Sequence, residues 1–66
     1  MTWEPRGKDT NGENTHIGVS MGRTWLITES PAHGVRLWRM DGMRRAMQGR
    51  FASVPEAQDY ADGVDV

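Results

Sequence analysis

Apolar and polar side chains alternate along the chain from residue 16 to residue 29. Ile17, Val19 and Met21 are separated by single small or polar residues, and a period of two places every second side chain on the same face of a strand. Gly22 and the arginine after it suit the two-residue loop of a type II′ turn, because glycine accepts the positive φ of its first position. Residues 24–29, TWLITE, are rich in β-branched and aromatic side chains. The pattern predicts a β-hairpin.

A second hairpin is predicted further along the chain. Residues 30–34, SPAHG, have the composition of a loop, and residues 35–40 form a third strand. Asp41-Gly42 is typical of a type I′ turn, which needs positive φ at both central positions, and residues 43–48 return as a fourth strand. In this register one surface carries the pairs Met40 with Met43, Trp38 with Arg45 and Arg36 with Met47, and the other carries Val35, Leu37, Arg39, Arg44, Ala46 and Gln48.

Residues 41–48 also fit a short helix. Asp41 could cap it, and the side chains of residues 43–48 are tolerable helix formers. The Asp-Gly pair favours the hairpin, and the two alternatives predict different arrangements of the arginines, because only the strand places them in rows.

A C-terminal helix is predicted from a capping box and a helical stripe. Ser53 and Glu56 have the spacing of a capping box, in which the side chain of each residue accepts a hydrogen bond from the backbone amide of the other. The apolar stripe consists of Ala57, Tyr60, Ala61 and Val64. Gly63 is a natural stop, so a helix of about ten residues is expected to pack on the sheet.

The predicted fold class is α+β, a three- or four-stranded antiparallel meander packed on one C-terminal helix. Residues 1–15 contain Trp3 as their one large apolar side chain, so we expect a mobile N-terminal tail, on which Trp3 could still dock. Residues 16–66 then form a single small domain. A chain of 66 residues buries a thin core, and its stability is marginal.

Composition narrows the class of protein further. The absence of cysteine excludes disulfides and thiolate zinc sites. No apolar run approaches the roughly 20 residues that span a bilayer, and the N-terminal residues do not resemble a secretory signal. We therefore expect a cytoplasmic protein of a bacterium or a phage, without membrane contact.

Charge is divided unevenly along the chain. Residues 23–50 hold six basic and two acidic side chains, a net charge of +4, whereas residues 51–66 hold four acidic side chains and no basic one. The formal net charge of the whole chain is -1, and this value hides a basic sheet followed by an acidic helix.

All six basic residues of that middle block are arginine. A guanidinium group offers a planar fork that suits phosphates and base edges, and aromatic rings among arginines suit stacking on bases. The sequence thus predicts a small DNA-binding or accessory protein with an arginine-rich hairpin. The expected nucleic-acid-binding residues are Arg36, Trp38, Arg39, Arg44, Arg45 and Arg50. The alternative is ordinary surface, on which arginine stems cover apolar area and pair with the acidic helix and tail.

The sequence also resembles a known family. Trp25-Leu26-Ile27, Leu37-Trp38-Arg39, Gly49-Arg50-Phe51-Ala52-Ser53, and Glu56-Ala57 with Tyr60-Ala61 are similar to the small three-strand-plus-helix DNA-binding domains at the N-termini of phage integrases, and to the AP2-type domain. The resemblance covers residues 23–64. It implies a sheet placed in the major groove of double-stranded DNA. Those domains precede a second module, so a free-standing copy is expected to need a homodimer or a partner.

The residues also suggest a second function. Met40, Met43 and Met47 share a predicted surface with Trp38, and methionine repacks to fit different partners. A small adaptor that binds a host protein through Trp38 and these methionines is therefore the alternative function.

Little points to catalysis. His16 and His33 match no metal motif, and a domain this thin has little room for a buried pocket. We expect no enzyme activity and no cofactor.

Overall fold

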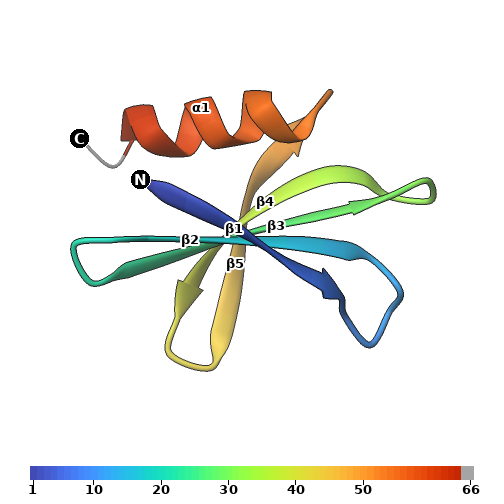
Figure 1. Cartoon of the computed structure of the whole chain (residues 1–66), viewed down its shortest axis with the longest axis horizontal. Helices are drawn as coiled ribbons and strands as arrows, with labels where there is room; N and C mark the ends of the chain where they lie inside the picture. Colours follow the sequence, from blue (N-terminus) through green and yellow to red (C-terminus); the bar gives the residue numbers. More distant parts are fainter. Residues whose placement is uncertain (65–66) are drawn as a thin grey trace.

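The chain folds as one five-stranded antiparallel sheet with a C-terminal helix on one face. The computed structural model describes residues 1–64. The strands follow one another in the sheet in chain order (Figure 1). The elements are β1 (Thr2–Lys8), β2 (Asn14–Ser20), β3 (Arg23–Ser30), β4 (Gly34–Asp41), β5 (Arg44–Phe51) and α1 (Val54–Val64). The predicted α+β class is confirmed, with one strand more than the upper estimate.

The additional strand comes from the segment expected to be a tail. Thr2–Lys8 form β1 and pair with β2, so the expectation of an unstructured segment over residues 1–15 is wrong for these residues. The reason is Gly18 in β2: a Cβ there would lie 2.7 Å from Met1 Sδ and 2.8 Å from the Trp3 ring. The missing side chain leaves the space in which Met1 and Trp3 pack against the core.

The first predicted hairpin is present, but its turn is one residue earlier. Ser20 pairs with Arg23, so the loop residues are Met21 and Gly22. Their φ angles are 49° and 81°, and positive φ at both positions is the mark of a type I′ turn rather than type II′. The sequence pattern predicts positive φ for glycine only, but Met21 also adopts a positive φ in this turn.

Residues 44–51 are a strand, so the helical alternative for residues 41–48 is wrong. Asp41 pairs with Arg44, and Gly42 and Met43 form the turn in place of Asp41-Gly42. Met40 therefore lies opposite Arg45 instead of Met43, and Trp38 opposite Met47 instead of Arg45. The observed register of β5 differs from the predicted one by two residues. Because side chains alternate with a period of two, each side chain up to Met47 stays on the predicted face. A bulge next to Trp38 then pairs Arg50 with Arg36.

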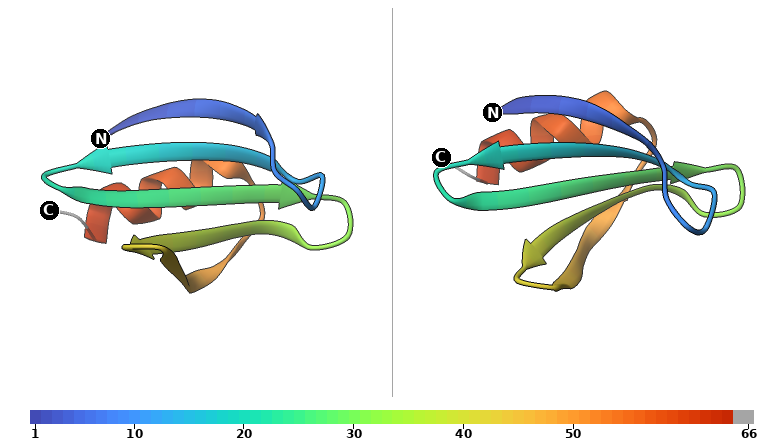
Figure 2. Two further views of the ribbon diagram at one scale, coloured as in Figure 1. Left: turned by 90° about the horizontal axis from the view of Figure 1, so that it is seen from below. Right: turned by 60° about the horizontal axis from the view of Figure 1, so that its bottom comes forward.

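Helix α1 closes one face of the sheet (Figure 2). Ala57 and Ala61 are fully buried, and their small side chains let the helix approach Trp25, Ile27 and Leu37, which fill the core. The other two members of the predicted stripe, Tyr60 and Val64, stay half exposed.

The predicted cap is present in modified form. The Glu56 amide donates to Ser53 Oγ at 3.3 Å, while Glu56 Oε2 accepts from the amide of Ala52 rather than from that of Ser53. Phe51 ends β5, and its ring lies 5.3 Å from that of Tyr60. These contacts fix the angle at which the chain enters the helix.

Candidate nucleic-acid interface on the open face

The sheet has a helix-covered face and, opposite it, an open face (Figure 2). The register sorts the side chains between them, because neighbours across strands point the same way. Trp25, Ile27, Val35 and Leu37 lie on the helix-covered face. On the open face, three cross-strand rows run from β2 to β5: Val19, Thr24, Met40 and Arg45; Ile17, Leu26, Trp38 and Met47; and Thr15, Thr28, Arg36 and Arg50.

Trp38 lies on β4, in the middle one of these three rows, and its ring is held by one hydrogen bond and by two guanidinium groups. Its indole Nε1 donates a hydrogen bond of 2.9 Å to Oγ1 of Thr28, which is fully buried. The guanidinium carbons of Arg45 and Arg36 lie 4.4 and 5.1 Å from its ring centroid, within the range of cation–π contacts. The ring is therefore fixed in orientation, and two guanidinium groups are gathered around it.

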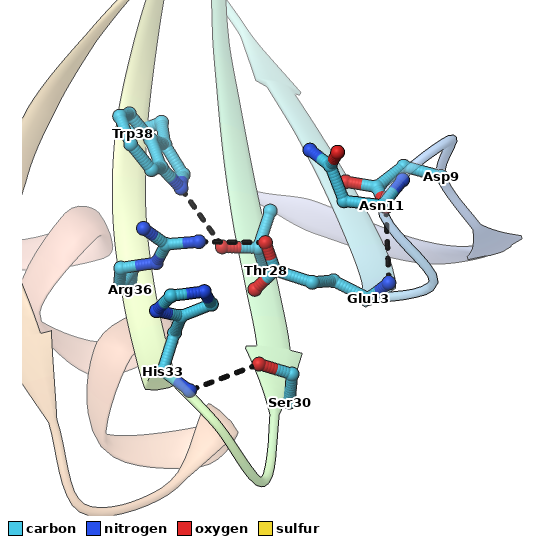
Figure 3. A network of polar contacts seen from close by, with 8 residues as sticks. All are labelled: Asp9, Asn11, Glu13, Thr28, Ser30, His33, Arg36 and Trp38. Carbon is cyan, nitrogen blue, oxygen red and sulfur yellow. Dashed lines mark hydrogen bonds and ion pairs between the residues drawn. The ribbon is translucent and has the colours of Figure 1, made fainter.

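Arg36 is fixed by a second contact. Its Nη2 donates to Glu13 Oε1 at 2.6 Å, and the two side chains are only 14% and 4% exposed. The turn before β2 positions Glu13, because Asp9 Oδ1 accepts from the amide of Glu13 at 3.0 Å and from that of Asn11 at 2.9 Å. Figure 3 shows the carboxylate reaching across Thr28 to the guanidinium. Arg36 is thus a preset planar group rather than a mobile cation.

His33 continues this arrangement beyond Arg36. In Figure 3, Trp38, Arg36 and His33 follow one another along β4 and the loop before it. The His33 amide donates to Ser30 Oγ at 3.1 Å, which shapes the loop. Next to these groups lies a polar hollow between residues 11–13 and residues 30–33, with Arg36 and Arg45 on its wall. The open face therefore ends in a recess whose lining includes Glu13 as well as the two arginines.

The structure divides the predicted nucleic-acid residues between the two faces. Trp38, Arg36, Arg45 and Arg50 share the open face. Arg39 and Arg44 lie on the opposite side, where the Arg39 guanidinium is 6.0 Å from the Trp25 ring. No ligand can contact all six residues through one face of the sheet.

The methionines of the alternative site are also divided. Met40 and Met47 flank Trp38 on the open face, with Met47 43% exposed. Met43 lies in the turn between β4 and β5 and is fully exposed. The open face thus combines basic and apolar side chains around one tryptophan.

Sequence reasoning missed Glu13, Thr28 and His33. Glu13 is 23 residues from Arg36, and it lies in the segment expected to be a tail. The hydrogen bond from Trp38 to Thr28 depends on the register between β3 and β4. No pattern in the sequence indicates either pairing.

The carboxylates of the strands nearest the site are confined to one face of the sheet. Among residues 1–64, the register places no carboxylate on the open face of β3, β4 or β5. Glu29 and Asp41 belong to the opposite face, on whose side α1 carries Glu56, Asp59 and Asp62. Glu13 reaches the open face from the turn before β2, where it is paired with Arg36.

The chain matches no protein-family model, and no curated protein or solved structure is significantly similar to it. Within residues 1–64, no helix has the length and apolar character needed to cross a bilayer. In the same part of the chain, no three histidine, aspartate or glutamate side chains converge as a metal ion would require.

Proposed function

We propose that this protein binds nucleic acid through the open face of its sheet. One observation carries the proposal: the guanidinium groups of Arg36 and Arg45 are gathered on Trp38, with Arg50 on the same face. Among the residues that the structure describes, none of the open-face positions of β3, β4 and β5 is occupied by aspartate or glutamate. Guanidinium groups hold phosphates by charge and by paired hydrogen bonds, and a neighbouring ring adds a stacking surface for bases.

The arrangement also limits the strength of binding. Arg36 is already paired with Glu13, so Arg45 and Arg50 are the open-face arginines that can neutralise phosphates. Two neutralised phosphates correspond to a slope of about -1.4 to -1.8 in a plot of log affinity against log salt. The net charge of -1 supplies no long-range attraction. We expect affinity that is easily measured at low salt and strongly reduced at physiological salt.

The test is a titration of a fluorescently labelled mixed-sequence oligonucleotide at roughly 50 and 200 mM salt. Arg45→Ala and Arg50→Ala remove one charge each from the open face. Arg39→Ala and Arg44→Ala remove the same charge from the other side and serve as matched controls. We expect the first pair to weaken binding several-fold and the second pair to have little effect. Equal effects from both pairs, or no binding at low salt, would contradict the proposal.

A second candidate function is supported by a separate observation. Ile17, Leu26, Trp38 and Met47 form an apolar row across the open face, and such a row suits a protein partner. An adaptor of this kind predicts partner capture that is abolished by Trp38→Ala and Met47→Ala, with weak salt dependence. Steep salt dependence with oligonucleotides favours the first function.

A further inference from the structure

The geometry points to single-stranded nucleic acid, rather than a duplex, as the ligand of the open face. This inference rests on the proposed function and specifies its ligand class. Three features carry it: the width of the sheet, the narrow track of basic groups, and the row of planar side chains that leads to the polar hollow.

The sheet is too wide to enter a groove of a duplex face-on. Adjacent strands are about 4.8 Å apart, so five strands span about 19 Å, whereas the major groove is about 12 Å wide. Trp38 and Arg36 stand on β4, which is hydrogen-bonded to β3 on one side and to β5 on the other. The β4–β5 hairpin therefore does not project as a free two-stranded ribbon. A duplex that lay on the open face over β4 and β5 would therefore also cover β2 and β1, at the other side of the sheet.

That second half of the face is unsuited to a phosphate backbone. At the level of Trp38, the row continues into Leu26, Ile17 and finally Glu4 of β1. The arginines of the three cross-strand rows stand on β4 and β5 alone. The two backbones of a duplex would need positive charge on the β2 half of the face as well as on β4 and β5, and the three rows place none on β2. The track on β4 and β5 therefore fits a single backbone.

The planar groups beside that track are arranged for stacking. Trp38, Arg36 and His33 follow one another along β4 and the loop before it (Figure 3). The guanidinium group of Arg45, from β5, lies over the Trp38 ring. Thr28 fixes the ring of Trp38, and Glu13 fixes the plane of Arg36 (Figure 3). Unpaired bases stack on aromatic rings and on guanidinium planes, whereas the bases of a duplex are already stacked on one another.

The polar hollow provides a place for one splayed base. It is lined by the turn at residues 11–13 and the loop at residues 30–33, with His33 and Arg36 at its side. Hydroxyl, amide and imidazole groups there can meet the polar edge of a base. Only a strand that is not base-paired can turn a base into such a recess without first breaking pairs.

The first experiment compares one mixed sequence as single-stranded DNA, single-stranded RNA and duplex DNA, at a single low salt concentration. At least one single-stranded form should bind about tenfold tighter than the duplex. A duplex that binds as tightly as both single strands, or more tightly, would overturn this inference and leave the proposed function standing. Absence of binding by all three forms would refute the proposed function itself and the inference with it.

A second measurement tests stacking separately from charge. Arg45→Lys keeps the positive charge but removes the planar fork, and Arg39→Lys makes the same change on the other side of the sheet. We expect Arg45→Lys to weaken single-strand binding about three- to tenfold, His33→Ala to weaken it to a smaller extent, and Arg39→Lys to leave it unchanged. If Arg45→Lys bound with wild-type affinity, the stacking of bases on these planar groups would be refuted. Circular dichroism serves as the control that each variant is folded.

Discussion

The two faces of the sheet each carry one central tryptophan, and the two residues have opposite surroundings. Trp25 is 1% exposed beneath α1 and packs with Ile27 and Leu37. Trp38 is on the open face, hydrogen-bonded to Thr28 and in contact with two guanidinium groups. The Trp25 ring packs in the core, whereas the Trp38 ring lies on the open face among arginine and apolar side chains.

This contrast arises from the alternation of side chains along a strand. In β4, Val35 and Leu37 enter the core while Arg36 and Trp38, their immediate neighbours, enter the open face. A single eight-residue strand thus contributes to stability and to the candidate site at the same time. Substitutions at odd and even positions of β4 should therefore have separable effects on folding and on binding.

The largest expected effect comes from comparing Trp25→Ala with Trp38→Ala. Removing a buried tryptophan costs about 3–5 kcal/mol, which is comparable with the whole stability expected of a chain this short. Trp25→Ala should be largely unfolded, whereas Trp38→Ala should lose about 1–2 kcal/mol and stay folded. Urea denaturation followed by circular dichroism measures both. Equal losses would show that the open face is part of the core.

The ion pair between Glu13 and Arg36 tests how far the open face depends on buried charge. Glu13→Ala leaves a largely buried guanidinium without its carboxylate, at a cost of about 3 kcal/mol. Replacing both residues with leucine removes both charges, and this double variant should be more stable than Glu13→Ala alone. A double variant that is less stable than Glu13→Ala would contradict the account of Arg36.

Two glycines test how tightly the first strand is attached. Gly18→Ala would force Met1 and Trp3 away from β2, because the new Cβ would lie within 3 Å of both, and overpacking of this kind costs about 1–3 kcal/mol. Gly49→Ala is the control, since its Cβ would lie 3.6 Å from Phe51 at ordinary contact distance. Hydrogen exchange should show faster exchange in β1 for Gly18→Ala only. Unchanged protection of β1 would contradict the docking of Trp3.

The smallest effect separates the helix from the binding surface. Ser53→Ala removes the hydroxyl that accepts from the Glu56 amide, which costs about 1 kcal/mol. Oligonucleotide affinity should be unchanged, because α1 lies on the other side of the sheet. A parallel loss of stability and affinity would argue for a site that includes the helix.

The elements that depend on local pattern could be predicted from the sequence. Alternation indicates the strands around Trp25 and Trp38, and the capping box at Ser53 indicates the helix. The face assignment of Arg36, Trp38 and Arg45 also follows, because the error in the turn shifted the register by two residues. Local chemistry is sufficient where neighbours in the sequence determine the conformation.

The parts that could not be predicted depend on residues far apart in the sequence. Trp3 orders β1 because Gly18 leaves space for it, and Glu13 fixes Arg36 across the sheet. The bulge next to Trp38 adds Arg50 to the open face. Composition alone cannot reveal such pairings, since each is a property of the assembled sheet.

The most direct test of the central claim is a titration followed by the three tryptophan indole signals in a proton–nitrogen spectrum, assigned with single Trp→Phe variants. Trp3 and Trp25 pack in or against the core, and Trp38 reports on the open face. A single-stranded oligonucleotide should shift the Trp38 signal progressively and leave that of Trp25 in place. Saturating oligonucleotide that leaves Trp38 unshifted would contradict the account.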